Sequence, residues 1–94
     1  MYIELNQKIK IIPTERGRKN PDGENIRREK RGRITSITER ILTVKTSNYN
    51  MTFNVSDIIA PYEYYLSVFI KNEWVELRAN KGIRSLKELI KRSD

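Results

Sequence analysis

The stretch of sequence that decides the fold is GRITSITERILTVKTSNYNMTFNVSDII, from Gly32 to Ile59. Within it, apolar and polar residues alternate in two short segments, ILTVKT at 41–46 and MTFNV at 51–55. A period of two indicates half-buried β-strands, and the intervening SNYN segment is rich in turn-forming residues. We therefore predict a β-hairpin whose buried face carries Leu42, Val44, Thr46, Met51, Phe53 and Val55.

The residues on either side of this hairpin extend the pattern. Ile34 and Ile37 are three positions apart, a spacing that one strand accommodates only with a β-bulge or a sharp bend. After the hairpin, SDIIAPY at 56–62 predicts a one-turn helix or a corner closed by Pro61. Asp57 is expected to cap that helix, as Asp does at a helix start.

Strands are also predicted near both ends of the chain. In YIELNQKIKIIP at 2–13, alternation places Ile3, Leu5, Ile9 and Ile11 on one side, and Pro13 ends the strand. YLSVFIK at 65–71 and WVELRA at 74–79 form a hairpin around the two-residue loop Asn72-Glu73. In this register the facing pairs are Ile70 with Val75, Val68 with Leu77, and Leu66 with Ala79.

The last segment, SLKELIKR at 85–92, changes to a helical period. Ser85 and Glu88 make a capping box, and Leu86, Leu89 and Ile90 share one face, which a two-turn helix must bury against the sheet. The whole chain, 1–94, is thus predicted to be one mainly-β domain. Its architecture is a small curled antiparallel barrel of five to six strands, with a long basic loop at 16–33 and a C-terminal helix at 85–92.

The long loop after the first strand, three hairpin-linked strands and a helical corner together resemble the SH3-like barrel family. The stretch from Gly32 to Ile59, about a third of the chain, also resembles uncharacterised short proteins of phages and mobile elements of low-GC Gram-positive bacteria. The aromatic run of peptide-binding SH3 domains is not present in the first loop, so the resemblance does not imply binding of Pro-rich peptides. The residues that carry the resemblance are Gly32, Ile34, Ile37-Thr38, Ile41, Val44, Tyr49, Thr52-Phe53 and Asp57-Ile58.

Charge is concentrated in the loop RGRKNPDGENIRREKRGR at 16–33, which contributes +5 of the net +7. Folded as a hairpin about Pro21-Asp22-Gly23, it would oppose like charges across its flanks, which is destabilising unless an anion lies between them. The alternative is a solvated arm without a ligand, the usual state of a charge run. The residues predicted to contact phosphates are Arg16, Arg18, Lys19, Arg27, Arg28, Lys30, Arg31 and Arg33.

Aromatic residues supply a second set of candidates. Phe69 and Trp74 point outward in the predicted hairpin, where we expect the C-terminal helix to cover them; left open, they would form a base-stacking platform or a homo-oligomer interface. Tyr62, Tyr64 and Tyr65 are either ordinary strand residues or anchors of a protein interface. Base stacking, if it occurs, is predicted for Tyr49, Tyr62 or Trp74.

Composition excludes several classes of function. The chain has no Cys and no His, so thiol chemistry, disulfides and the commonest general base and metal ligand are unavailable to it. No catalytic motif occurs, and we predict a protein that is not an enzyme and that has no cofactor or metal. No signal peptide or transmembrane run is recognised, which predicts a cytoplasmic protein without a membrane partner.

A sequence pI near 9.9 favours an anionic partner. The leading expectation is a small phage or mobile-element protein that binds nucleic acid, DNA or RNA, non-specifically through the basic loop. The alternative is a protein-binding module or inhibitor that docks on a host enzyme or defence complex through the basic loop and the Tyr cluster.

Overall fold

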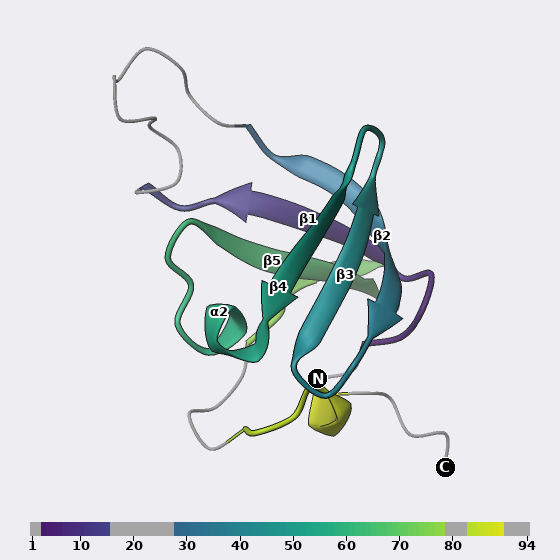
Figure 1. Ribbon diagram of the computed structural model, residues 1–94. Helices are drawn as coiled ribbons and strands as arrows, with labels where there is room; N and C mark the ends of the chain where they lie inside the picture. The colour runs from purple at the N-terminus through teal and green to yellow at the C-terminus, as the bar shows by residue number, and fades with distance from the viewer. Residues whose placement is uncertain (1–2, 16–27, 79–82, 90–94) are drawn as a thin grey trace.

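The computed structural model describes residues 3–15, 28–78 and 83–89, and these form a mainly-β fold built on one sheet (Figure 1). Six antiparallel strands lie in the order β4-β3-β2-β1-β5-β6, and the sheet curls without closing. The predicted fold class is confirmed at this level. The elements are β1 (Lys8–Pro13), β2 (Lys30–Ile37), β3 (Ile41–Thr46), β4 (Asn50–Asn54), α2 (Val55–Ile59), β5 (Tyr64–Ile70), β6 (Glu73–Glu76) and the 3-10 turn η1 (Leu86–Leu89).

One apolar core fills the inner side of the curled sheet. Five strands, helix α2, the N-terminal segment and η1 all contribute to it, which is how so short a chain buries enough apolar surface. Eight of its side chains are almost fully buried. The core residues are Ile3, Ile9, Ile11, Ile34, Leu42, Val44, Phe53, Val55, Ile58, Leu66, Val68, Leu77 and Leu86.

The central hairpin agrees with its prediction. β3 and β4 pair with Leu42 opposite Phe53 and Val44 opposite Met51, so the expected residues share the inner face. The predicted bulge is also present, because the β2–β3 register shifts between Ile34 and Ser36.

The helical corner is present as α2, and Asp57 helps to cap it. The N-cap residue itself is Asn54, whose side chain accepts a hydrogen bond from the Ser56 N–H at 3.3 Å. Asp57 occupies the third helical position and accepts the Asn54 N–H at 2.8 Å, which completes a capping box.

The first strand is shorter than predicted. Asn6 adopts a positive φ of 67°, and the Gln7 side chain accepts the Glu4 N–H at 3.1 Å, so residues 4–7 form a turn and β1 begins only at Lys8. Ile3, Ile9 and Ile11 are buried as expected, but Leu5 is 58% exposed at the turn. The prediction for Leu5 was wrong because the alternation hid a turn.

The last hairpin turns one residue earlier than predicted. Its central turn residues are Lys71 and Asn72, with φ values of 49° and 65°, which is the signature of a type I′ turn. Phe69 therefore pairs with Trp74, and Val68 pairs with Val75 rather than with Leu77. The predicted register was wrong by two residues, and a shift of two leaves every side chain on its predicted face.

This turn predicts a gain in stability. Replacing Lys71-Asn72 by Asn-Gly should raise the free energy of unfolding by about 1 kcal/mol, because an ordinary L-residue pays that much for left-handed geometry. Urea denaturation measures the change. Glu73→Gly, which creates Asn-Gly at the sequence-predicted turn, serves as the control and should destabilise the protein; stabilisation by this control would support the predicted register instead.

The C-terminal segment differs from its prediction in both conformation and location. Residues 86–89 form a 3-10 turn, and residues 90–94 lie outside the described part of the chain. The Ser85 hydroxyl accepts the Lys87 N–H at 3.2 Å, whereas Glu88 reaches the N–H of Arg84 rather than that of Ser85. Leu86 is fully buried in the core, and its N–H donates to the Glu39 carbonyl in the β2–β3 turn.

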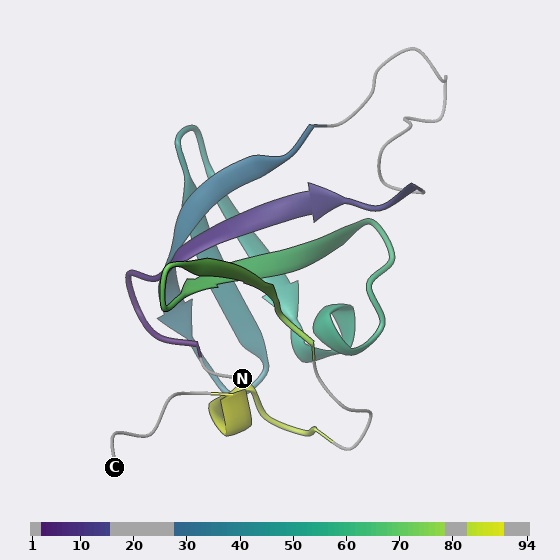
Figure 2. The ribbon, with the colours of Figure 1, turned by 180° about the vertical axis from the view of Figure 1, so that it is seen from behind.

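The strand order determines which residues meet on the outer side of the sheet. β1 lies between β2 and β5, as Figure 2 shows from behind. Residues that alternate with the buried positions of these strands, together with their neighbours on β3 and β6, face away from the core. The charged residues of β1 and β2 are thereby placed beside the aromatic residues of β5 and β6.

Candidate nucleic-acid interface

Five cations and two aromatic residues lie together on the outer side of the sheet. The register of β1, β2 and β3 brings the cations to adjacent positions, and the β5–β6 hairpin adds the aromatic pair next to β1. We call this surface the cationic sheet face; it consists of Lys8, Lys10, Arg31, Arg33, Lys45, Phe69 and Trp74.

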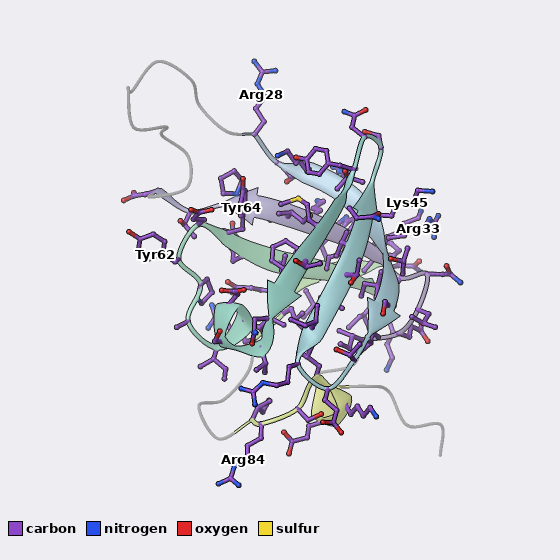
Figure 3. All side chains as sticks on the ribbon, in the orientation of Figure 1. Arg28, Arg33, Lys45, Tyr62, Tyr64 and Arg84 are labelled. Atoms are coloured by element: carbon purple, nitrogen blue, oxygen red, sulfur yellow. The ribbon has the colours of Figure 1, made fainter. Side chains whose placement is uncertain are left out.

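Like charges oppose each other at three cross-strand pairs of this face. Lys8 lies opposite Arg33, and Lys10 lies opposite Arg31. Arg33 also lies opposite Lys45 on its other side. Figure 3 shows these last two side chains next to each other, far from Arg84. Directly opposed like charges destabilise a sheet, so this arrangement costs stability that a bound anion would restore.

The aromatic pair sits among these cations. The Phe69 and Trp74 rings meet edge to face with centroids 5.1 Å apart. Lys10 Nζ lies 4.2 Å from the Trp74 ring centroid, and Lys8 Nζ lies 5.7 Å from that of Phe69. The Arg31 guanidinium is 5.9 Å from the Trp74 ring. Both rings are half-buried, and the cationic groups of Lys8, Lys10 and Arg31 lie within 6 Å of their centroids.

The predicted cover by the C-terminal helix is not what the structure shows. Leu86 enters the core on the inner side of the sheet, whereas Phe69 and Trp74 alternate with the buried Val68 and Leu77 and face the other way. The expectation that η1 would cover the aromatic pair was therefore wrong for residues 83–89. The Leu86 N–H donates to the Glu39 carbonyl, which holds this segment at the β2–β3 turn.

Two acidic side chains lie at the margin of the cationic sheet face. Glu29 pairs with Arg31 at 3.3 Å, and Glu76 pairs with Arg78 at 2.6 Å. Both pairs are largely exposed, so their net contribution to stability is small. Within the described residues, no ion pair with an acidic side chain involves Lys8, Lys10, Arg33 or Lys45.

The predicted basic loop is divided by the structure. Arg16, Arg18, Lys19 and Arg27 lie outside the described residues, and Arg28 is exposed where the described chain resumes. Lys30, Arg31 and Arg33 belong to strand β2 rather than to a loop, so the predicted boundary at residue 33 was wrong. The β-ladder with β1 extends to Lys30 because Ile11 and Leu66 continue the core there.

The predicted tyrosines occupy a different part of the surface. Tyr49 is 46% exposed and Tyr62 is 62% exposed, whereas Tyr64 and Tyr65 are half-buried. Lys30 Nζ lies 5.2 Å from the Tyr49 ring and 5.9 Å from the Tyr64 ring. Tyr62 and Tyr64 line a pocket of about 380 Å³ together with Met51, Thr52, Phe53, Asp57 and Glu63.

Two features of the described residues concern metal binding and membrane insertion. Across residues 3–15, 28–78 and 83–89, no three acidic side chains come together as a cation site would require. No helix within the same ranges has the length and hydrophobicity to cross a bilayer.

Sequence reasoning missed Lys8, Lys10 and Lys45 as site residues. Alternation in β1 already placed Lys8 and Lys10 opposite the buried isoleucines, which was the available signal. Their proximity to Trp74 depends on β1 pairing with β5, a contact between segments more than fifty residues apart. No local pattern contains that pairing.

The opposed charges predict a stability gain from removing one of them. Lys45→Gln should raise the free energy of unfolding by about 0.2–1 kcal/mol at low ionic strength, because it relieves the repulsion with Arg33. The gain should shrink at high salt, where charges are screened. Urea denaturation at two salt concentrations measures the gain. The control is Lys87→Gln in η1, which changes the net charge by the same amount. Equal effects of the two substitutions would mean that the repulsion is negligible.

No protein-family model, curated protein or solved structure matches this chain. The functional assignment therefore rests on the geometry and charge of the cationic sheet face.

Proposed function

We propose that this protein binds nucleic acid without base specificity and without catalysis, using the cationic sheet face. The observation that carries the proposal is a set of three like-charge pairs on one face, Lys10 with Arg31, Lys8 with Arg33, and Arg33 with Lys45. A polyanion is the ligand that turns three repulsive pairs into phosphate contacts. The cations of the predicted basic loop add to the net charge that attracts the same ligand.

The net charge of +7 supports the same class of ligand, because it raises the rate and strength of association with any polyanion. The resemblance to short phage and mobile-element proteins remains a prediction. It is compatible with a small accessory nucleic-acid-binding protein, but the proposal does not depend on it.

The second candidate function is docking on an acidic protein surface. It is favoured by the pocket lined by the exposed Tyr62 and the half-buried Tyr64, because tyrosine is enriched among the anchor residues of protein interfaces. In that case the Tyr cluster would carry most of the affinity, and binding would depend weakly on salt.

Fluorescence anisotropy with labelled DNA and RNA over a range of salt concentrations tests the proposal. The face variant carries Gln at Lys8, Lys10 and Lys45, and the matched control carries Gln at Arg40, Arg84 and Lys87. Both lose three charges, so both have a net charge of +4 (7 − 3). A third variant with Gln at Arg16, Arg18 and Lys19 measures the contribution of the basic loop separately.

The face variant should bind at least tenfold more weakly than the control at low salt. Its log–log salt slope should also be shallower by about 2, since each lost phosphate contact removes about 0.7–0.9 from the slope. Equal affinity of the face variant and the control would reject the sheet face as the binding surface. Absence of binding in every protein would leave the acidic-surface candidate.

A further inference from the structure

Three cations and both aromatic rings of the sheet face form a single row that crosses the strands. Lys45 on β3, Arg33 on β2 and Lys8 on β1 are successive neighbours in the register, and Phe69 on β5 and Trp74 on β6 continue the row. The row has a cationic half and an aromatic half. They meet where the Lys8 ammonium lies 5.7 Å from the Phe69 ring centroid. Since neighbouring strands are about 4.8 Å apart, the row spans roughly 19 Å.

The two halves of the row suit different parts of one ligand. Three cations over roughly 10 Å of the row suit phosphates along a nucleic-acid backbone. The rings beyond them offer an apolar face on which a nucleobase can stack. Both groups project from the same side of the sheet, so backbone and base must approach the protein together.

A duplex cannot satisfy both halves at once. Its bases are stacked on one another inside two rims of phosphate, and an aromatic ring level with the phosphate-binding cations does not reach a base face. In a single strand the bases are splayed from the backbone and can lie on a protein ring while the adjacent phosphates bind cations.

The position of Lys10 adds a second observation. Its ammonium lies 4.2 Å from the Trp74 ring centroid, where it occupies the surface that a base would use. Lys10 also lies opposite Arg31, so it is held over the ring next to a like charge. A flexible lysine can leave the ring for a phosphate of the incoming strand, which exposes the Trp74 face to the neighbouring base.

From these observations we infer that the preferred ligand is a short single-stranded segment. It crosses the sheet perpendicular to the strands, with phosphates on Lys45, Arg33 and Lys8 and one base stacked on Trp74 in place of Lys10. This inference rests on the proposed function, since it specifies the form of nucleic acid that the same face binds.

Trp74 is the only tryptophan of the chain, so its fluorescence reports on this site alone. The ligands are single-stranded oligonucleotides of about eight nucleotides, the matching duplex, and inorganic polyphosphate as a backbone without bases. Saturating single strand should quench Trp74 emission strongly. Duplex and polyphosphate, bound to equal occupancy by anisotropy competition, should not quench it.

Substitution at the ring gives an independent readout. Trp74→Leu should weaken single-strand binding about five- to hundredfold, the range that loss of one stacked base produces. It should leave the affinity for polyphosphate unchanged. Tyr62→Leu, which removes an exposed aromatic residue outside the row, is the matched control and should bind single strands like the native protein.

The outcomes separate this inference from the proposed function. Suppose the face variant loses binding, but single strands do not quench Trp74 emission and bind Trp74→Leu as tightly as the native protein. The proposed function then stands, and the single-strand inference is overturned. Tighter binding of duplex than of single strand also overturns it. If no nucleic acid binds at low salt, both are overturned.

Discussion

Gly32→Val is expected to lower the free energy of unfolding by about 3 kcal/mol or more, at or above the upper end of the usual cost of overpacking. A Cβ at Gly32 would lie 2.3 Å from the Lys45 carbonyl oxygen and 2.9 Å from Val44 Cγ1. The nearest atom belongs to the backbone of β3, which cannot rotate away as a side chain can. Strand β2 would have to move from β3 at the centre of the sheet.

Intrinsic strand preference predicts the opposite result. Valine favours β-strands and glycine weakens them, so a position in the middle of β2 should gain stability when Gly32 becomes Val. The two expectations differ in sign, which makes the measurement decisive. Urea denaturation followed by circular dichroism provides it, with Thr52→Val on the exposed side of β4 as a control for strand preference.

A destabilised Gly32→Val with an unchanged or stabilised Thr52→Val would confirm that the β2 and β3 backbones need this close approach. Equal stability of Gly32→Val and the native protein would contradict the local geometry of the sheet. Gly32 also lies between Arg31 and Arg33. The close approach of the β2 and β3 backbones at Gly32 therefore helps to set the distance between Arg33 and Lys45.

The sequence predicted the parts of the fold that depend on local pattern. The β3–β4 hairpin, the bulge after Ile34 and the helix at 55–59 all follow from periodicity and turn chemistry over a few residues. The errors occurred where the structure depends on contacts between distant segments or on an unusual backbone conformation. Leu5 was assigned to a strand because the turn at Asn6 was not recognised. Asn6 adopts a positive φ, and no glycine, the residue that usually marks such a conformation, is present there.

The candidate site was harder to predict than the fold. The concentration of charge led to the prediction of a binding site at residues 16–33. The opposed cation pairs instead form between residues of β1, β2 and β3. The aromatic pair was identified from alternation alone, because Phe69 and Trp74 keep their face when the register shifts by two. Its contact with Lys8 and Lys10 required the β1–β5 pairing, which brings distant segments of the chain together.

The second large effect is expected at the other end of the chain, for Leu86→Ala. Leu86 is fully buried among core residues contributed by the strands, so its truncation should cost about 2–5 kcal/mol through lost burial and a residual cavity. That is a large part of the ~5–15 kcal/mol by which small domains are stable. Urea denaturation measures the loss, and Leu5→Ala is the matched control because Leu5 is 58% exposed.

Trp74 emission in the folded variant distinguishes the observed location of η1 from the one predicted by sequence. With Leu86 on the inner side of the sheet, Leu86→Ala should destabilise the protein while the emission maximum of folded Trp74 stays unchanged. A helix over Phe69 and Trp74 would instead expose the indole when its contact is lost, and the emission would shift to longer wavelength. Stability equal to that of Leu5→Ala would contradict the burial of Leu86. An emission shift would mean that the aromatic half of the cationic sheet face is covered and unavailable to a base.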